Sequence, residues 1–250
     1  MAFSIVAWSE SQDTAGILTA VQALVDQHIT TEGDNVLVPS FAPNLAGVFA
    51  LGATISQAQV TSPSLRRGLL FDVAPINIGA EPVNRPYMHD LFRNPIPLVP
   101  SEGLQVRVAE GAAGAERETV LAWLQSEFEE PASGEIMTVR ATSTTTLTAD
   151  VWSLCNLTLS QQLEAGRYQI VGMKATSAGA VAARLVLPGS EFRPGVIAGD
   201  SLGDVSIVNQ RYGNHGVFGE FEHTFVPAVE FLSGSADTSE EVYLDIIKVA

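Results

Sequence analysis

The chain has 250 residues, of which 46% are hydrophobic and 16% charged, a composition typical of a well-packed globular protein and not of a disordered one. Its 28 acidic residues outnumber 13 basic residues, and the resulting formal net charge of −15 argues against direct binding of nucleic acid. A single cysteine excludes a disulfide within the chain, so we expect packing and oligomerisation to provide the stability.

The N-terminal segment contains neither a basic region nor an apolar run long enough for a secretion signal, so export by that route is not expected. No run of about 18 apolar residues occurs either, and a membrane-spanning helix is not predicted. The first predicted element is a strand, Phe3–Ser9. An amphipathic helix is predicted over Thr14–His28, with Asp13 at its start and Gly33 beyond its end. Its apolar stripe would comprise Ile17, Leu18, Val21, Leu24, Val25 and His28.

Two glycine-marked stretches then resemble each other, AGVFALGA at 46–53 and AGRYQIVGM at 165–173. Superposing Gly47 on Gly166 gives a separation of 119 (166 − 47). In the second stretch alternation puts Tyr168 and Ile170 on one face and Arg167, Gln169 and Val171 on the other, which is typical of a half-buried scaffold strand. Further landmarks recur at similar separations: Arg66 and Arg184 (184 − 66 = 118), Val120 and Val242 (242 − 120 = 122), His89 and His215 (215 − 89 = 126), and Phe92 and Phe218 (218 − 92 = 126).

The spacing of these landmarks predicts a duplicated chain with domains 1–131 and 132–250, joined at the Pro/Gly-containing stretch Glu129–Gly134. A β-rich segment, Ile136–Ala149, opens the second copy as Phe3–Ser9 opens the first. The first copy carries additional residues, assigned to the helix, and the second an additional loop at Glu191–Asp204. About eight short strands in about 120 residues predict a sandwich or jelly roll. We therefore expect an all-β chain of two tandem jelly-roll β-sandwiches, with one amphipathic helix inserted in the first.

The strongest enzymatic candidate is the set His215, Glu220, Glu222 and His223, because imidazoles and carboxylates on neighbouring strands can bind a metal. A cupin-like site requires a close His-x-His pair, which the chain lacks. His215 also has a predicted counterpart in His89 without flanking glutamates, which favours a structural position such as a turn. No catalytic, cofactor or metal residue is therefore predicted, although the role of His215 and His223 stays open.

Other polar residues have a structural and a functional interpretation. Cys155 lies in the apolar run WSLCNLTL and is expected to be a buried thiol. Asp200 and Asp204 lie in the loop GDSLGD, which is either solvated or a Ca²⁺ site between subunits. Arginines are few, and four of them stand out: Arg66, Arg67, Arg184 and Arg193. We expect Arg66 and Arg184, which recur at equivalent places, to pair with carboxylates at a strand end or at the interface between units.

A chain of two consecutive β units without visible catalytic residues resembles the double jelly-roll major capsid proteins of icosahedral viruses, including membrane-containing bacteriophages. The resemblance covers the whole chain but is one of architecture. It implies a structural protein that forms homotrimers with a pseudo-hexagonal outline in a capsid lattice. It also implies minor capsid and vertex proteins as partners, often a membrane beneath the shell, and location in the virion after synthesis in the host cytoplasm.

Two alternatives remain open at this point. One is a β-sandwich module for carbohydrate binding or adhesion, although such sites use exposed aromatic side chains. Trp8, Trp123 and Trp152 all fall in predicted strands, where packing in the core is the usual role of tryptophan. The other alternative is a cupin-like metal enzyme.

Overall fold

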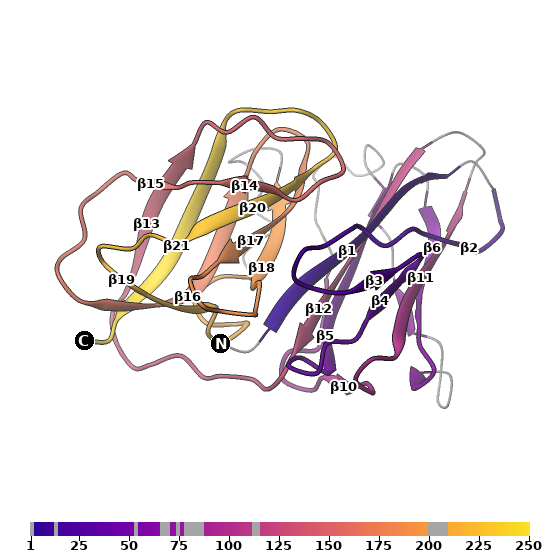
Figure 1. Ribbon diagram of the computed structural model, residues 1–250, viewed down its shortest axis with the longest axis horizontal. Helices are drawn as coiled ribbons and strands as arrows, with labels where there is room; N and C mark the ends of the chain where they lie inside the picture. Colours follow the sequence, from indigo (N-terminus) through magenta and orange to yellow (C-terminus); the bar gives the residue numbers. More distant parts are fainter. Residues whose placement is uncertain are drawn as a thin grey trace. The chain divides into compact units, whose positions relative to one another are not determined.

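The structure, a computed structural model, describes residues 3–12, 15–52, 55–65, 71–73, 76–77, 88–111, 116–199 and 210–250. The regular secondary structure of these residues consists of β-strands, so the chain is all-β (Figure 1). The chain divides into two compact units. The first unit is Ile5–Ser126, and the second is Glu127–Ala250 together with Met1–Ser4. The division falls between Ser126 and Glu127, whereas the sequence predicts a boundary after residue 131.

The described residues of the first unit form two β-sheets, and its first strand enters this unit from Phe3 and Ser4, which belong to the second unit. Its strands are β1 (Phe3–Gln12), β2 (Thr19–Ala20), β3 (Thr31–Glu32), β4 (Asn35–Leu37), β5 (Asn44–Gly52), β6 (Ile55–Thr61), β7 (Phe71–Val73), β8 (Ile76–Asn77), β9 (His89–Asp90), β10 (Ile96–Pro97), β11 (Gly103–Glu110) and β12 (Glu116–Gln125). One sheet has the order β1-β12-β5-β10, with β8 and β9 also on β5. The other has the order β3-β4-β11-β6-β7, with β2 also on β11.

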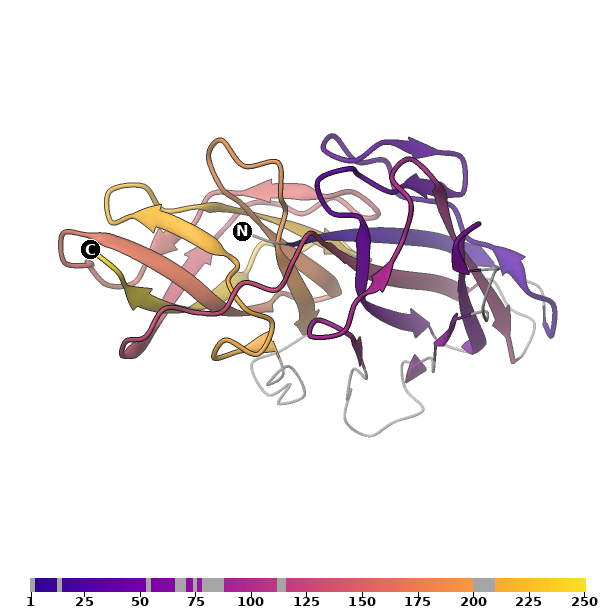
Figure 2. The ribbon, with the colours of Figure 1, turned by 90° about the horizontal axis from the view of Figure 1, so that it is seen from below.

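The second unit contains one continuous sheet that bends back on itself (Figures 1 and 2). Its strands are β13 (Ile136–Ser143), β14 (Ser153–Cys155), β15 (Thr158–Leu159), β16 (Arg167–Thr176), β17 (Ala180–Val186), β18 (Gly195–Gly199), β19 (Gly219–Glu222), β20 (Ala228–Ser233) and β21 (Glu240–Lys248). The order is β14-β20-β17-β18-β16-β21-β13-β15, with β19 also on β16. Because β18 pairs with both β17 and β16, it joins the two halves of the sheet.

The glycine-marked stretch of the second unit forms β16 and is more deeply buried than predicted. Tyr168 and Ile170 are 1% and 0% exposed, but Val171 is also buried and so is Gln169. The Tyr168 hydroxyl donates to the carbonyl of Glu164 at 2.9 Å, so its polar end is satisfied at the edge of the core. Both faces of this strand are therefore covered, and the prediction of a half-buried strand is wrong.

The predicted helix at Thr14–His28 is also wrong, because the described part of this segment is extended chain with β2 in the middle. The backbone N–H of Val21 donates to Val106 in β11, and that of Leu24 donates to Ala7 in β1. These donors therefore serve neighbouring strands and not a helical turn. Val25, part of the predicted apolar stripe, is 82% exposed. Pairing with distant strands overrides the local helical periodicity.

The two units repeat the same irregularities of strand pairing. β12 faces β5 with Ala46 as an extra residue between Leu45 and Gly47, which is a β-bulge. β21 faces β16 with a bulge at Val171, between Ile170 and Gly172. When Gly47 is matched with Gly172, a separation of 125 (172 − 47), the bulged residues Ala46 and Val171 occupy equivalent positions in the two units.

A second pair of matching bulges lies in β6 of the first unit and β17 of the second. In β6 the extra residue is Ser56, because Ile55 and Gln57 face consecutive residues of β11. In β17 it is Val181, because Ala180 and Ala182 face consecutive residues of β20. Val181 also follows Ser56 by 125 positions (181 − 56). The duplication is therefore present in the backbone pairing, at the level of single residues.

The register corrects several of the sequence landmarks. Gly47 matches Gly172 and not Gly166. Val120 and Val242 do correspond, because they face Ala50 and Ala175, which are themselves 125 apart (175 − 50). The bulges match Ala182 with Gln57, and Arg184 therefore matches Gln59, 125 positions earlier (184 − 59). Arg66, with which the sequence pairs Arg184, lies outside the described residues.

The histidine and phenylalanine landmarks are wrong as well. The N–H of Leu91 donates to the bulged Ala46, and the N–H of Gly213 donates to the bulged Val171, so these donors are equivalent at a separation of 122 (213 − 91). His89 therefore matches Arg211 (211 − 89 = 122) and not His215. Phe92 and Phe218 are 126 positions apart, whereas equivalent residues of this segment are 122 apart, so these two phenylalanines do not correspond either.

The extra residues of the first unit form a hairpin and not a helix. Bridges join Ala15 to Glu110 and Ala149 to Ser233, and Ala149 follows Ala15 by 134 positions (149 − 15). Equivalent residues of β5 and β16 are only 125 positions apart. The first unit therefore has nine more residues than the second between Ala15 and β5 (134 − 125). β3 and β4 lie in this interval and pair with each other.

The predicted extra loop of the second unit, Glu191–Asp204, is not supported by the spacing. Gly195 and Arg211 are 16 positions apart (211 − 195), against 17 for their counterparts Asp72 and His89 (89 − 72). The apparent surplus arose from matching Arg66 and His89 with the wrong residues.

Candidate functional site

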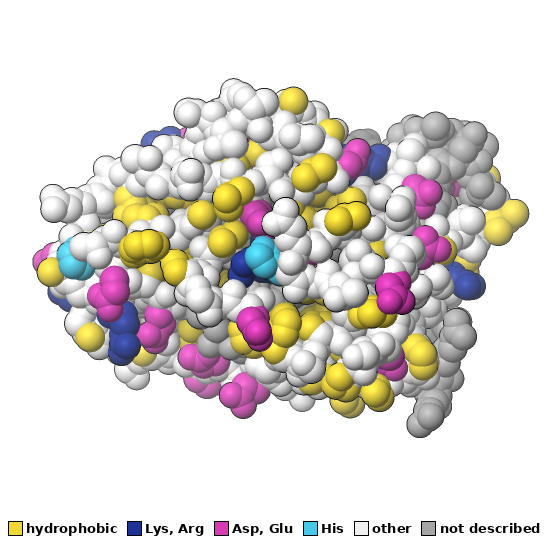
Figure 3. Space-filling view, viewed as in Figure 1, with side chains coloured by type: hydrophobic (Ala, Val, Ile, Leu, Met, Phe, Trp, Pro, Cys, Tyr) yellow, Lys and Arg dark blue, Asp and Glu magenta, His cyan; other side chains and the backbone are white. Residues whose placement is uncertain are grey.

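Charged side chains are scattered over the face drawn in Figure 3, and most of them are acidic. This distribution follows from the excess of 28 acidic over 13 basic residues. The face shows no continuous basic stripe of the kind that follows a phosphate backbone.

The glutamates of the predicted metal set lie on β19, which pairs with the start of β16. Glu220 faces Gln169 in the register, and its carboxylate lies 3.4 Å from the Nε of Arg167. Glu222 faces Arg167 along the same strand pair and is exposed. These carboxylates therefore border solvent near an arginine.

The two histidines of that set have different surroundings. His215 is 2% exposed and ends the turn at residues 212–215. The sequence predicts such a structural position for it. The Nδ1 of His223 accepts the N–H of Gly166 at 3.2 Å. Within the described ranges, no three His, Cys, Asp or Glu side chains are grouped so that they could hold a metal ion.

Cys155 is buried in β14, and its Sγ lies 3.5 Å from the carbonyl of Ser153. Burial raises the pKa of this thiol to about 11, with a smaller contribution from the nearby Glu240. A thiol with such a pKa stays protonated at neutral pH and is a poor nucleophile. The other predicted candidates Arg66, Arg67, Asp200 and Asp204 lie outside the described residues.

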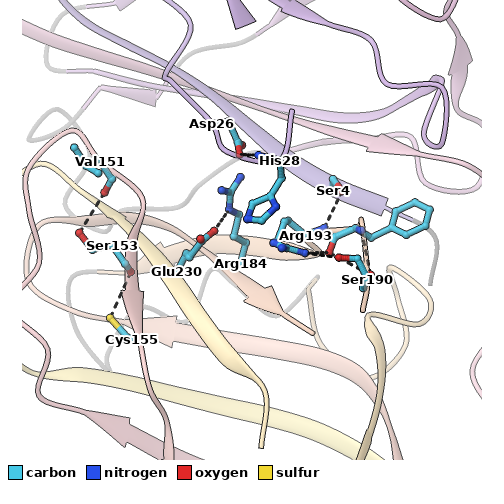
Figure 4. A network of polar contacts seen from close by, with 11 residues as sticks. Ser4, Asp26, His28, Val151, Ser153, Cys155, Arg184, Ser190, Arg193 and Glu230 are labelled. Carbon is cyan, nitrogen blue, oxygen red and sulfur yellow. Dashed lines mark hydrogen bonds and ion pairs between the residues drawn. The ribbon is translucent and has the colours of Figure 1, made fainter. Parts of the chain in front are cut away.

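Arg184 forms a buried cross-strand ion pair (Figure 4). Its Nε lies 2.6 Å from the Oε2 of Glu230, the residue that faces it on β20. Its guanidinium also lies 4.1 Å from the centre of the Trp152 ring, a cation–π distance. The prediction of a carboxylate partner is confirmed for Arg184, whose side chain is 1% exposed.

Arg193 is buried in a different way and uses backbone acceptors (Figure 4). Its Nη1 donates to the carbonyl of Ser190 at 2.7 Å and to that of Phe192 at 3.0 Å. Its backbone N–H donates to the hydroxyl of Ser4 at 2.8 Å. Arg193 thus fixes the loop before β18 and contacts Ser4 near the start of β1.

Several hydrogen bonds meet in a set that we call the Asp245 cluster, formed by Thr138, Arg211, Tyr212 and Asp245. Asp245 is 0% exposed. Arg211 binds it through two nitrogens, Nε to Oδ2 at 2.5 Å and Nη2 to Oδ1 at 2.6 Å. The Thr138 hydroxyl donates to Oδ1 at 2.7 Å, and the N–H of Tyr212 donates to Oδ2 at 3.2 Å. The hydrogen bond with Asp245 raises the pKa of Arg211.

The bulge of β16 makes room for the Asp245 cluster. A Cβ on Gly172 would lie 2.6 Å from Asp245 Oδ2 and 2.7 Å from the nitrogen of Tyr212, so only glycine fits. The matched position in the first unit, Gly47, adjoins Trp123 and Met88 instead. Asp245 accepts four hydrogen bonds, two at each oxygen, which leaves it little capacity to bind a ligand. We therefore interpret the cluster as a structural clamp.

A polar groove of about 420 Å³ lies beside the hairpin β3–β4 of the first unit. Its lining offers amide, hydroxyl and backbone groups and one carboxylate, and consists of Glu32, Asn35, Leu37, Thr61, Ser62, Pro63, Ser101, Gly103 and Gln105. The hairpin belongs to the nine additional residues of the first unit. The groove is thus a feature that the duplication does not explain.

No family model and no curated protein matches this sequence. The part of the chain that the structure describes has no helix with the length and apolar character needed to cross a membrane.

Sequence reasoning missed the Asp245 cluster and Glu230. A signal for Asp245 was present, since it is an acidic residue in the otherwise apolar run VYLDII at 242–247. An acid inside such a strand requires a buried partner. Its partner Arg211 lies 34 positions earlier in a turn, and no periodicity connects the two residues.

Proposed function

We propose that this chain is a structural protein, the major capsid protein of an icosahedral virion, in which it forms trimeric pseudo-hexagonal capsomers. The observation that carries the proposal is the duplicated strand pairing with its matched bulges. A duplicated fold gives one chain two similar wedges. Three chains then supply six wedges, which fit a nearly sixfold tile.

The strand order supports two tandem jelly rolls. With the short strands β3, β4, β8, β9 and β15 left out, the first unit has β1-β12-β5-β10 and β2-β11-β6-β7, and the second has β13-β21-β16-β19 and β14-β20-β17-β18 along its bent sheet. In each unit the first long strand neighbours the last, as in a Greek key. Eight strands in two such four-stranded layers are the arrangement of a jelly roll.

The polar clusters fit a scaffold. The Asp245 cluster fixes the turn at Arg211 to β21, the Arg184–Glu230 pair joins β17 to β20, and the backbone contacts of Arg193 fix the loop before β18. The net charge of −15 suits a shell without direct contact with nucleic acid. Further partners would be minor capsid and vertex proteins and an underlying viral membrane. The protein would be located in the virion after synthesis in the host cytoplasm, for example that of a bacterium infected by a phage.

The test is the assembly state of the purified protein. Sedimentation velocity at micromolar concentration should give a trimer, and negative-stain electron micrographs should show pseudo-hexagonal particles or shells. A strictly monomeric protein up to tens of micromolar would remove the basis of the proposal.

A second candidate function, carbohydrate binding, is favoured by the polar groove beside β3–β4. Its amide, hydroxyl and carboxylate groups suit a neutral polyol. Trp8 and Trp123 are fully buried, however, and so offer no stacking surface to a sugar. A glycan array should give no hit if the capsid proposal holds, and a hit lost on Gln105→Ala would support the carbohydrate module instead.

A further inference from the structure

The two units differ at the start of their first long strands. β1 begins at Phe3 and β13 begins at Ile136, and each pairs with the last strand of its unit. Phe3 and Ser4 are 1% and 0% exposed, whereas Ile136 and Met137 are 38% and 37% exposed. The same position of the fold is thus covered in one case and open in the other.

Phe3 and Ser4 are covered by residues of the second unit, to which they belong. The ring of Phe3 meets that of Phe218 edge-on, with 4.9 Å between centroids. The Ser4 hydroxyl accepts the N–H of Arg193 at 2.8 Å. Phe218 is the residue immediately before β19. The covering surface therefore has two parts, the segment that leads into β19, which meets Phe3, and the loop before β18, which meets Ser4.

The start of β13 has no such cover among the described residues. One edge of β13 pairs with β21 from Ile136 to Ser143. On the other edge, β15 pairs only with Ala141 and Thr142, and Ser160 adds a bond to the carbonyl of Arg140. An open strand edge flanked by exposed apolar side chains favours association with another chain.

The duplication indicates which surface would cover it. β10 corresponds to β19, because Ile96 faces Leu45 as Gly219 faces Ile170. The two separations are 123 (219 − 96) and 125 (170 − 45). The residue before β10 is Pro95, in the place of Phe218. We propose that Ile136–Thr138 of one copy docks on the turn Arg93–Ile96 of a second copy of this chain.

The receiving turn is open and chemically suitable. Arg93 and Asn94 are exposed, and Pro95 and Ile96 are half-buried. Proline and isoleucine there offer apolar surface to Ile136 and Met137. The two contacting surfaces differ, so each copy offers one surface to the copy before it and the other to the copy after it. Such head-to-tail contacts form a ring when the rotation between copies closes, and the proposed trimer requires closure after three copies. The inference rests on the proposed capsomer and identifies its contact.

Charge substitution tests the contact with a matched control. Met137→Glu should weaken trimer formation at least about 100-fold, because it places a carboxylate in an apolar contact. Phe225→Glu alters another exposed apolar residue of the same unit, at 62% exposure, and should leave the trimer unchanged. Adding Asn94→Lys to Met137→Glu should restore most of the association, since the two charges would then face each other.

Cross-linking tests the same contact without weakening it. The double variant Met137→Cys, Asn94→Cys should form disulfide-linked dimers and trimers under mild oxidation, whereas each single variant should not. The native Cys155 should not interfere, because it is buried and its pKa is raised to about 11. Non-reducing electrophoresis provides the readout, and far-UV circular dichroism checks that each variant is folded.

The outcomes separate this contact from the proposed function. A wild-type trimer that survives Met137→Glu and yields no cross-link overturns the contact, while the capsomer proposal stands. A monomeric wild-type protein without cross-links overturns both. A trimer lost only on Met137→Glu, together with the cross-linked ladder, supports the contact.

Discussion

A buried carboxylate can stabilise a fold only if its hydrogen-bonding capacity is filled, and Asp245 meets this condition. Arg211 supplies the opposite charge through two nitrogens, and Thr138 and Tyr212 supply the remaining donors. The desolvation cost of the pair is offset by four hydrogen bonds, of which the three from side chains are short. Removal of one partner should therefore cost more than the pair contributes as a whole.

Asp245→Asn tests this expectation. The variant leaves Arg211 charged and largely buried without a carboxylate, so the free energy of unfolding should fall by about 3–5 kcal/mol. Urea denaturation followed by fluorescence gives the value. The control is Glu241→Gln, which breaks the exposed pair with Arg140 and should leave the midpoint nearly unchanged. Equal losses in the two variants would contradict the special role of Asp245.

Glu240 predicts a dependence of stability on pH. It is 1% exposed, and burial raises its pKa above the ordinary value of 4.5, an effect that the hydroxyl of Ser143 partly offsets. The folded state therefore favours the protonated form. Its contribution to stability is fully present below about pH 4.5 and is lost as the pH rises through the raised pKa. Glu240→Gln should remove this loss and be more stable than wild type at about pH 8.

The neighbouring Glu241 provides the opposite sign as a control. Its hydrogen bond with Arg140 lowers its pKa, so its contribution is present above the unfolded pKa and is lost as the pH falls through the folded one. Chemical denaturation at a series of pH values measures both effects. A Glu240→Gln variant with the pH profile of wild type would show that the carboxyl group is ionised without cost.

Among the elements, the sequence was most informative about strands and least about register. Alternating and β-branched runs predicted the strand at Phe3–Ser9 and the β-rich start of the second unit, and both are strands. Gly47 was matched with Gly166 because a glycine in a turn and a glycine at a bulge look alike in sequence. Gly166 has a φ of +149° beside the end of the chain, whereas Gly172 is required by the close approach of Asp245. Only the pairing of distant strands distinguishes them.

The predicted helix failed for a related reason, and Gly16 provides a test. In a helix over Thr14–His28, Gly16→Ala would stabilise the protein by about 1 kcal/mol. In the structure Gly16 has a φ of +71° and donates its N–H to Glu110 at 2.9 Å. Alanine is strained at such a φ, so we expect a loss of about 1 kcal/mol. Thermal unfolding measures the sign, and a stabilised variant would favour the helix.

At the scale of the whole molecule, the duplication preserved strand pairing while side chains diverged. At one matched bulge the first unit has Trp123 and Met88 against Gly47, and the second has Asp245 and Arg211 against Gly172. Matched positions thus hold an apolar contact in one copy and an ion pair in the other. The backbone bulge is the common requirement, because each glycine admits a bulky neighbour. Similar backbones with different surfaces are what a pseudo-sixfold tile of two alternating wedges requires.

The net charge of −15 gives a prediction for the assembly as a whole. Copies with the same charge repel each other, and added salt screens this repulsion over the Debye length, about 30 Å at 0.01 M and about 10 Å at 0.1 M. The proposed copy-to-copy contact is apolar, so salt should not weaken its attractive part. Raising the ionic strength from about 0.01 M to 0.1 M should therefore shift the sedimentation profile towards trimers and larger assemblies. Dissociation on adding salt would instead indicate a contact made by opposite charges, and would contradict an apolar interface at Met137.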